Sequence, residues 1–215
     1  MKPTDPASLS SRRAHLKQFF ALGTLLYLQF FLLYGSSNYY LASNEIAHYH
    51  FYFDWELHIP LIAPFIYIYL SLSLFLILPV FYLRYKQLPA WALSYMWMTF
   101  IACSLFIIFP TELAGTRPTI ISGSTLTQAS FSLLYFFDKP HNLFPSLHIA
   151  YTTLALLIIL NSDFNRRWQG TIIFWWLLLL ISILFVHQHY MLDILGGLVL
   201  ATGCFYCIYL SKNKI

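Results

Sequence analysis

Long apolar stretches alternate with short polar segments along most of this chain. Six stretches are nearly free of charge and approach the length of about 20 residues that a helix needs to cross a bilayer. They lie at about 19–36, 59–82, 89–109, 146–162, 171–187 and 190–210. Backbone groups find no water to bond inside lipid, so each stretch is predicted to be a helix. The pattern therefore predicts an all-α, polytopic membrane protein with six transmembrane helices.

One further uncharged stretch, from Pro118 to Phe137, does not fit this count. Its polar side chains are too many for a span that faces lipid. They are Thr119, Ser122, Ser124, Thr125, Thr127, Gln128 and Ser130. We expect a surface or re-entrant segment here, with a short amphipathic helix near Phe131 to Phe137 that rests at the membrane interface.

The composition indicates lipid rather than water as the main solvent. The chain of 215 residues is 59% hydrophobic and 9% charged, whereas a soluble domain carries about a quarter charged residues. Aromatic residues make up 20%, and Tyr and Trp are typical of the headgroup region. The formal charge of +4 is not gathered in one basic block, so we do not expect nucleic acid as a partner.

The basic residues divide the loops between two sides of the membrane. Ten of the twelve fall on one side: Lys2, Arg12, Arg13, Lys17, Arg84, Lys86, Arg166, Arg167, Lys212 and Lys214. The alternate loops hold six of the eight acidic residues and only two basic ones, Arg117 and Lys139. Because Lys and Arg collect on the cytoplasmic side, both termini are predicted to be cytoplasmic.

The remaining features suggest a single membrane domain over 1–215. Basic residues precede the first apolar run as in a signal peptide, but that run is long enough to span and lacks an A-x-A cleavage site. We therefore expect an uncleaved first helix. The three cysteines lie in apolar stretches and give no disulfide framework, so Cys204 and Cys207 are interpreted as small apolar fillers.

Three polar groups that are far apart in sequence fall on the predicted outer face. Arg117-Pro118 follows the third span, 142–148 leads into the fourth span, and 187–193 lies between the fifth and sixth. His189 and Asp193 are four residues apart, so a helix that begins near His189 brings them to one face. A carboxylate on one ring nitrogen leaves the other nitrogen to attack phosphorus or bind a metal. A solvated pair at a helix end is the alternative.

The other two groups offer contacts for an anion. A helix that starts at Pro145 and Ser146 presents free backbone amides and a hydroxyl to phosphate. One turn further, His148 can protonate a departing lipid alkoxide; a helix-end His bonded to the loop is the alternative. Arg117 can bind two phosphate oxygens, and a snorkelling side chain is the alternative for either Arg117 or Lys139.

Together these residues resemble the type 2 phosphatidic acid phosphatase superfamily, whose six-helix core carries the motifs K-x6-R-P, P-S-G-H and S-R-x5-H-x3-D. Here T-R-P stands at 116–118, F-P-S-L-H at 144–148 and H-Q-H-Y-M-L-D at 187–193, so the catalytic motifs lie within 110–197. The resemblance implies that His189 forms a phosphohistidine, Asp193 orients it and His148 protonates the leaving group. It also implies that Arg117 and Ser146 hold the phosphate, and that neither metal nor cofactor is needed.

Several motif positions differ from the family pattern. The Lys of the first motif falls on Pro110, the Gly of the second is Leu147, and the Ser-Arg of the third falls on Ser182-Ile183. Two expected cations are therefore absent from these positions. F-P-S-L-H and Q-H-Y-x-x-D instead resemble the branch that includes inositol phosphorylceramide synthase-like transferases and many bacterial lipid phosphatases.

The absent cations leave the phosphate-binding set open. We hypothesise that His187 or Lys139 supplies the lost positive charge, and Asn142 is a further candidate for a phosphate contact. The expected partners are a phosphorylated lipid substrate and the bilayer itself. The oligomeric state is not indicated by the sequence.

The leading prediction is a membrane lipid phosphatase that hydrolyses a lipid phosphate or pyrophosphate at the extracytoplasmic face, with a bacterial inner membrane favoured. The alternative is a lipid phosphotransferase that passes the group to an alcohol, sugar or second lipid. A metal- or haem-binding membrane protein is a third class, suggested by outer histidines: His48, His50, His58, His187 and His189. A transporter would need ionisable residues near mid-membrane, where these stretches have none.

Overall fold

The computed structural model describes residues 6–44, 46, 48–115, 117–118, 121–162 and 164–213, with side chains from residue 11 onward. Within these ranges the chain is helical, with two isolated β-bridges and no strand. The long helices are α1 (Pro6–Ser43), α5 (Leu88–Ile108), α6 (Thr125–Phe137), α7 (Leu147–Leu160), α8 (Arg166–Phe185) and α9 (Met191–Cys204). The all-α prediction therefore holds for the described part of the chain. Lys2, Glu45, Thr116, Thr119 and Lys214, used in the sequence predictions, lie outside it.

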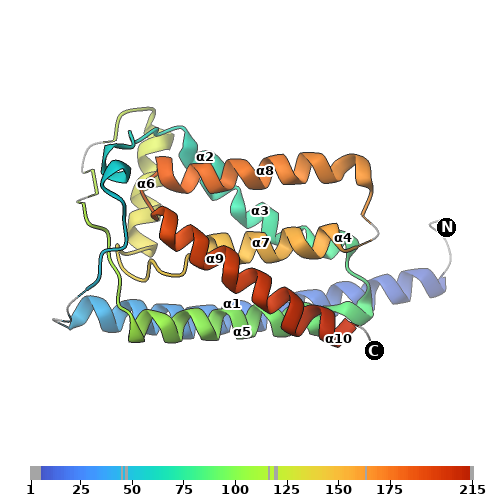
Figure 1. Ribbon diagram of the computed structural model, residues 1–215. Helices are drawn as coiled ribbons and strands as arrows, with labels where there is room; N and C mark the ends of the chain where they lie inside the picture. The colour runs from blue at the N-terminus through green and yellow to red at the C-terminus, as the bar shows by residue number, and fades with distance from the viewer. Residues whose placement is uncertain are drawn as a thin grey trace.

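Shorter elements complete the bundle. Between the first loop and α5 lie η1 (Asp54–His58), α2 (Phe65–Leu70), α3 (Leu72–Ile77), α4 (Pro79–Tyr82) and η2 (Tyr85–Gln87). After α9 the chain continues as the π-helical turn η3 (Phe205–Leu210) and α10 (Ser211–Asn213). Figure 1 shows α1, α5, α7, α8 and α9 running lengthwise beside one another, with both termini at one end of the bundle and α6 lying across the other end.

Among the residues that the structure describes, five helical segments are long and apolar enough to cross a membrane: Ser11–Ser43, Phe65–Tyr82, Tyr85–Ile108, Arg166–Phe185 and Met191–Asn213. The stretch predicted as the fourth span contains the shorter helix α7, because Ser146 caps it and a turn begins at Asn161. With a rise of about 1.5 Å per residue, its 14 residues reach roughly 21 Å, less than the roughly 30 Å of a hydrocarbon core. Six spans and cytoplasmic termini therefore stay predictions.

Helix α7 lies at the centre of the bundle. It packs against α3, α5, α8 and α9, and ten of its fourteen residues are buried. Its neighbours cover the apolar side chains that a lone helix would expose to lipid. This central position holds the first turn of α7, which carries His148, within the protein.

The stretch predicted as one helix over 59–82 is broken into α2, α3 and α4. The helix begins only at Phe65, after Pro64, and α4 begins at Pro79, whose missing N–H interrupts the helical bonding. At Ser71 the hydroxyl donates to the carbonyl of Ile68 at 2.6 Å and accepts from the indole of Trp175 at 2.8 Å. A side chain thus stabilises the break and ties it to α8.

Two helices are longer than predicted. Helix α1 extends on both sides of 19–36, because charged residues near its start continue the helix rather than end it. Helix α6 begins at Thr125 instead of near Phe131, where the hydroxyl of Ser124 caps it by accepting from the amide of Thr127 at 3.2 Å. Thr127, Phe131 and Leu134 are buried along one face of α6, so this helix is amphipathic. The location of α6 at the membrane interface remains a prediction.

Candidate active site

The loops that carry the sequence motifs gather at one end of the bundle, opposite both termini (Figure 1). Backbone hydrogen bonds join them there. The amide of Tyr49 donates to the carbonyl of Pro110 at 2.7 Å, and the amide of Leu113 donates to the carbonyl of Pro140 at 3.1 Å. Segments distant in sequence are therefore fixed side by side around the start of α7 and α9.

His148 and His189 face each other in this region. Nδ1 of His148, in the first turn of α7, lies 3.1 Å from Nε2 of His189, which stands just before α9. On the far side of the His189 ring, Nδ1 lies 3.5 Å from a carboxylate oxygen of Asp193. His189 is 5% exposed and Asp193 is 1% exposed, so both groups meet in a site with little water. The structure brings these three predicted catalytic residues together; their roles in the reaction stay predictions.

One arrangement of protons satisfies the contacts of both rings. The Asp193 carboxylate faces Nδ1–H of His189, which leaves Nε2 of His189 as the acceptor for Nδ1–H of His148. The remaining nitrogen of His148, Nε2, lies 2.8 Å from the hydroxyl of Tyr69 and accepts its proton. In this arrangement the unprotonated nitrogen of His189 is Nε2, which points away from Asp193 and toward His148, as a nucleophile requires.

Tyr69 is a site residue that the sequence reasoning missed. It lies in α2, 2% exposed, in an apolar stretch where a tyrosine is expected to pack against its neighbours. Its contact with His148 spans 79 residues of sequence, and no motif surrounds it. Only the packing of α2 against the rest of the bundle could reveal this contact.

The Asp193 side chain is held in place by the start of α9. One carboxylate oxygen, Oδ2, accepts from the backbone amide of Tyr190 at 2.9 Å, and the hydroxyl of Tyr190 in turn accepts from the amide of Ala114 at 3.1 Å. The carbonyl of Asp193 accepts from the amide of Ser146 at 3.0 Å. The same residue therefore orients His189 and joins α9 to the loop that enters α7.

Two glycines allow α9 to approach that loop closely. A Cβ on Gly197 would lie 2.6 Å from the backbone oxygen of Ser146, and a Cβ on Gly196 would lie 2.5 Å from the ring of Phe144. Both distances are shorter than atoms tolerate, so larger residues would push the helix and loop apart. This approach brings the first turn of α7, which carries His148, beside the start of α9.

Gly197→Ala is expected to destabilise the protein by about 1–3 kcal/mol, the usual cost of forcing an extra methyl group into a packed interior. Thermal unfolding of the detergent-solubilised protein would measure the loss. Gly203→Ala in the same helix is the matched control, since a Cβ there meets nothing within 4 Å. Equal melting temperatures for the two variants would contradict the role given to Gly197.

Arg117 contacts Gln188, the residue before His189, and is held by several groups. One guanidinium nitrogen donates to the carbonyl of Asp138, and the other donates to the side-chain oxygen of Gln188 at 3.0 Å. The guanidinium also covers the ring of Tyr135, 4.7 Å from its centre. Asp138 is fixed from the opposite side by the hydroxyl of Tyr34 in α1, which donates to its carboxylate. The cation is therefore positioned before any substrate arrives.

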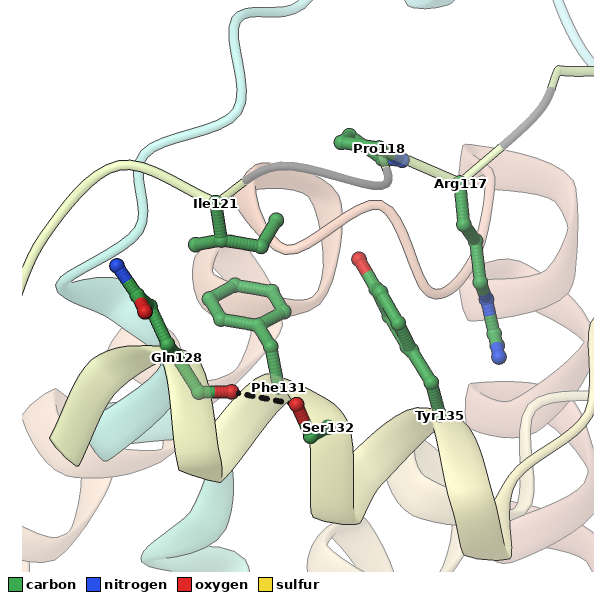
Figure 2. Close-up of a pocket in the computed structure, with 7 residues that line it drawn as sticks. All are labelled: Arg117, Pro118, Ile121, Gln128, Phe131, Ser132 and Tyr135. Carbon is green, nitrogen blue, oxygen red and sulfur yellow. Dashed lines mark hydrogen bonds between the residues drawn. The ribbon is translucent and has the colours of Figure 1, made fainter. Parts of the chain in front are cut away.

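A groove of about 640 Å³ extends from Arg117 along α6. In Figure 2, Phe131 and Tyr135 rise from α6 toward Ile121 and Pro118, and the Arg117 side chain lies alongside the Tyr135 ring. Gln128 and Ser132 add polar groups to the lining. Burial raises the pKa of the Tyr135 phenol, which the nearby Arg117 partly offsets, so its hydroxyl stays protonated. The lining combines one cation with apolar and neutral polar groups, which suits an amphiphile with an anionic head.

Two of the predicted phosphate contacts lie in the loop before α7. Ser146 is fully buried, and its hydroxyl accepts from the amide of Ile149 at 3.4 Å. Asn142 has a positive φ of 62° and donates from its side chain to the hydroxyl of Ser37 at 3.1 Å. Both side chains therefore shape the loop, and their contact with phosphate remains a prediction.

The loop is also held by Thr111, which the sequence reasoning did not select. Its hydroxyl oxygen accepts from the amides of Leu143 and Phe144, at 3.1 and 3.0 Å. Thr111 is 1% exposed. A single threonine outside any motif gives no sequence signal for this contact.

The two residues proposed to replace the absent cations point to other partners. A ring nitrogen of His187, Nε2, lies 3.0 Å from the carbonyl of Ile59. The ammonium group of Lys139 lies 6.0 Å from the centre of the Phe136 ring, on an exposed side chain. Their contribution to phosphate binding stays a hypothesis.

Comparison with known proteins gives one match. The family described as the PAP2 superfamily matches residues 45–207, a range that contains all three motif regions. No curated protein and no solved structure matches the chain.

Proposed function

The chain belongs to the PAP2 superfamily, and from this premise we propose that it is an integral membrane lipid phosphatase. The membership supports an enzyme of the phosphatase or phosphotransferase type. The lipid substrate, the hydrolysis and the extracytoplasmic site are our proposal. The observation that carries it is the 3.1 Å approach of His148 to His189, with Asp193 behind the His189 ring.

In the first step, Nε2 of His189 attacks the phosphorus of a lipid phosphate or pyrophosphate and forms an N–P bond. The bond from phosphorus to the departing oxygen breaks, and protonated His148 gives its Nδ1 proton to that oxygen. Arg117 balances the charge on the phosphoryl oxygens. Negative charge at Asp193 stabilises the positive charge that develops on the His189 ring.

In the second step, water attacks the phosphohistidine and the N–P bond breaks. The now neutral His148 takes a proton from the water, so inorganic phosphate leaves and both histidines return to their starting states. The Tyr69 hydroxyl accepts a hydrogen bond from His148 when that ring is charged and donates one when it is neutral. It can therefore hold the ring in one orientation through both steps.

Tyr69→Phe is expected to lower kcat by about tenfold, since a lost hydrogen bond of about 1.4 kcal/mol corresponds to a factor of ten in rate. Initial rates of phosphate release from a lipid phosphate in mixed micelles would measure this. Tyr67→Phe is the matched control in the same helix, because the Tyr67 hydroxyl pairs with Thr127 at 2.9 Å rather than with His148. Wild-type kcat in Tyr69→Phe would rule out its positioning role.

We place the site on the outer side of the membrane, with six spans and both termini in the cytoplasm. Two observations support this topology: the basic residues collect in alternate loops, and the motif loops lie at the end of the bundle away from both termini (Figure 1). A cysteine introduced at the exposed Lys139 should react with a membrane-impermeant maleimide in intact cells. Reaction only after lysis would reverse the topology.

A second candidate function is a lipid phosphotransferase. It is favoured by the sequences F-P-S-L-H and Q-H-Y-x-x-D, which resemble those of the branch that includes inositol phosphorylceramide synthase-like transferases. Both reactions share the phosphohistidine step and differ in whether water or an alcohol resolves it. Purified protein should therefore be given one phosphate-labelled lipid, with and without alcohol, sugar and lipid acceptors. Release of free phosphate in every case supports the phosphatase, whereas label that moves only to an acceptor supports the transferase.

A further inference from the structure

A second cluster of ionisable side chains lies at the outer end of the bundle, among residues that the proposed reaction does not use. His48, Glu112 and His141 come from three separate segments and present one ligand atom each, all within 4.8 Å of one another. The backbone joins the same segments, through a bridge between Tyr49 and Thr111 and another between Glu112 and His141. Backbone pairing therefore holds the three ligand residues close together.

The distances within the cluster differ from those of hydrogen bonds. Nδ1 of His48 lies 3.6 Å, and Nδ1 of His141 3.5 Å, from the same oxygen, Oε2 of Glu112. Hydrogen bonds of this kind measure about 2.7–3.2 Å. Two ligands of a tetrahedral zinc ion, each about 2.0–2.1 Å from the metal, stand roughly 3.3 Å apart. The two spacings fit atoms that share a cation better than atoms that share a proton.

The environment of the two imidazoles supports the same reading. Their side chains are 10% and 16% exposed, and their rings stack at 4.8 Å with an interplanar angle of 23°. Within the described residues, the buried atoms Nε2 of His48 and Nδ1 of His141 have no hydrogen-bond partner. Leaving a buried polar atom unpaired costs about 1–3 kcal/mol. For His141 the unpaired atom is the one that faces Glu112.

We propose that His48, Glu112 and His141 bind a divalent transition-metal ion, with Zn²⁺ the best fit to two imidazoles and one carboxylate. His50 is a candidate fourth ligand, because its Nε2 lies 3.6 Å from the other Glu112 oxygen, Oε1. Its Nδ1 lies 3.2 Å from the Glu112 carbonyl, an orienting contact typical of metal-bound histidines. Water is the alternative in the fourth position.

This site is separate from the catalytic pair and does not depend on the proposed reaction. The sequence grouped His48 with His187 and His189, but in the structure His189 faces His148 and His187 faces a carbonyl. The ligands that complete the site, Glu112 and His141, were not part of that grouping. They are brought to His48 only by the meeting of the three segments.

A metal here would cross-link the loops that lead to the active site. Glu112 follows Thr111, whose hydroxyl holds the amides of Leu143 and Phe144, and His141 precedes Asn142 in the same loop. The ion would thus fix the chain that enters α7. We therefore assign it a structural role, with the chemistry left to the histidine pair.

The test uses the full-length protein in detergent, free of any polyhistidine tag, stripped with EDTA and titrated with ZnCl₂. Elemental analysis after desalting should give about one zinc per chain for the wild type and for His58→Ala, the control from the same outer region. His141→Ala and Glu112→Gln should bind zinc at least tenfold more weakly. Zinc should raise the melting temperature of the wild type and of the control, and leave the melting temperatures of His141→Ala and Glu112→Gln unchanged.

Cobalt(II) gives a second readout, because a visible absorption band reports its coordination in the folded protein. The band should appear for the wild type and be lost in Glu112→Gln, which removes the charge but keeps the size of the side chain. Wild-type protein that binds no zinc would overturn the proposal, as would a wild-type affinity for zinc in either His141→Ala or Glu112→Gln. Phosphate release is measured separately, so loss of the metal proposal leaves the proposed function standing.

Discussion

His189→Gln is expected to lower the rate of phosphate release by at least about 10³-fold, because the amide cannot form the N–P bond. The same change should abolish a phosphorylated protein intermediate that survives base and is lost in acid. Brief incubation with a phosphate-labelled lipid, followed by an alkaline quench, would trap that intermediate in the wild type. The expected effect is large, since no other described side chain places a ring nitrogen between His148 and Asp193.

His58→Gln is the control for this experiment. His58 lies at the end of η1, where it is exposed and its ring contacts the carbonyl of Asp54 at 3.0 Å. It should label like the wild type. Equal labelling of His189→Gln, or a wild type that never labels, would show that the reaction runs without a phosphohistidine at this position.

Asp193→Asn is expected to reduce the rate by about 10³- to 10⁴-fold, as when the acid that orients a catalytic histidine is changed to an amide. Oδ2 of Asp193 both accepts from the amide of Tyr190 and faces Nδ1 of His189. An asparagine oxygen in that place would keep the shape of the start of α9 but would carry no negative charge. The positive charge that develops on the His189 ring during attack on phosphorus would then lose its stabilisation.

The measurements for this variant are the rate of phosphate release and the melting temperature. A large loss of rate with a melting temperature near that of the wild type would support an orienting role. Asp54→Asn, at an exposed acidic residue in η1, should keep the wild-type rate. If Asp193→Asn also kept most of its rate, the carboxylate would serve only to close the start of α9.

The sequence could predict the helical nature of the chain and the central part of the site. Uncharged apolar stretches allow few structures other than helices, and four-residue spacing puts His189 and Asp193 on one side of a helix start. The distribution of Lys and Arg among the loops predicts that the motif regions lie on one side of the membrane. In the structure these regions do lie together, and His148 contacts His189.

Other features had no local signal in the sequence. Hydrophobicity cannot distinguish a lipid-facing span from a short central helix, so the sequence predicts a helix over 146–162 where α7 covers Leu147–Leu160. The break between α2 and α3 at Ser71 is stabilised by a hydrogen bond from Trp175, a residue distant in sequence. Tyr69, Thr111 and the approach of His141 to Glu112 depend on contacts between distant segments. Such contacts follow from tertiary packing and leave no periodic pattern.

The hydrogen bond from Tyr34 to Asp138 has a consequence for the transfer of this active site between proteins. The family match begins at residue 45, but Tyr34 precedes it and fixes the residue whose carbonyl holds Arg117. Ser37, also in α1, supports Asn142 in the same way. A chimera that placed residues 45–207 of this chain in a relative would contain both histidines of this chain. It would take α1 from the relative, and so would lack the Tyr34 and Ser37 that support the loops here. A transplant of residues 45–207 should therefore also include Tyr34 and Ser37 of α1.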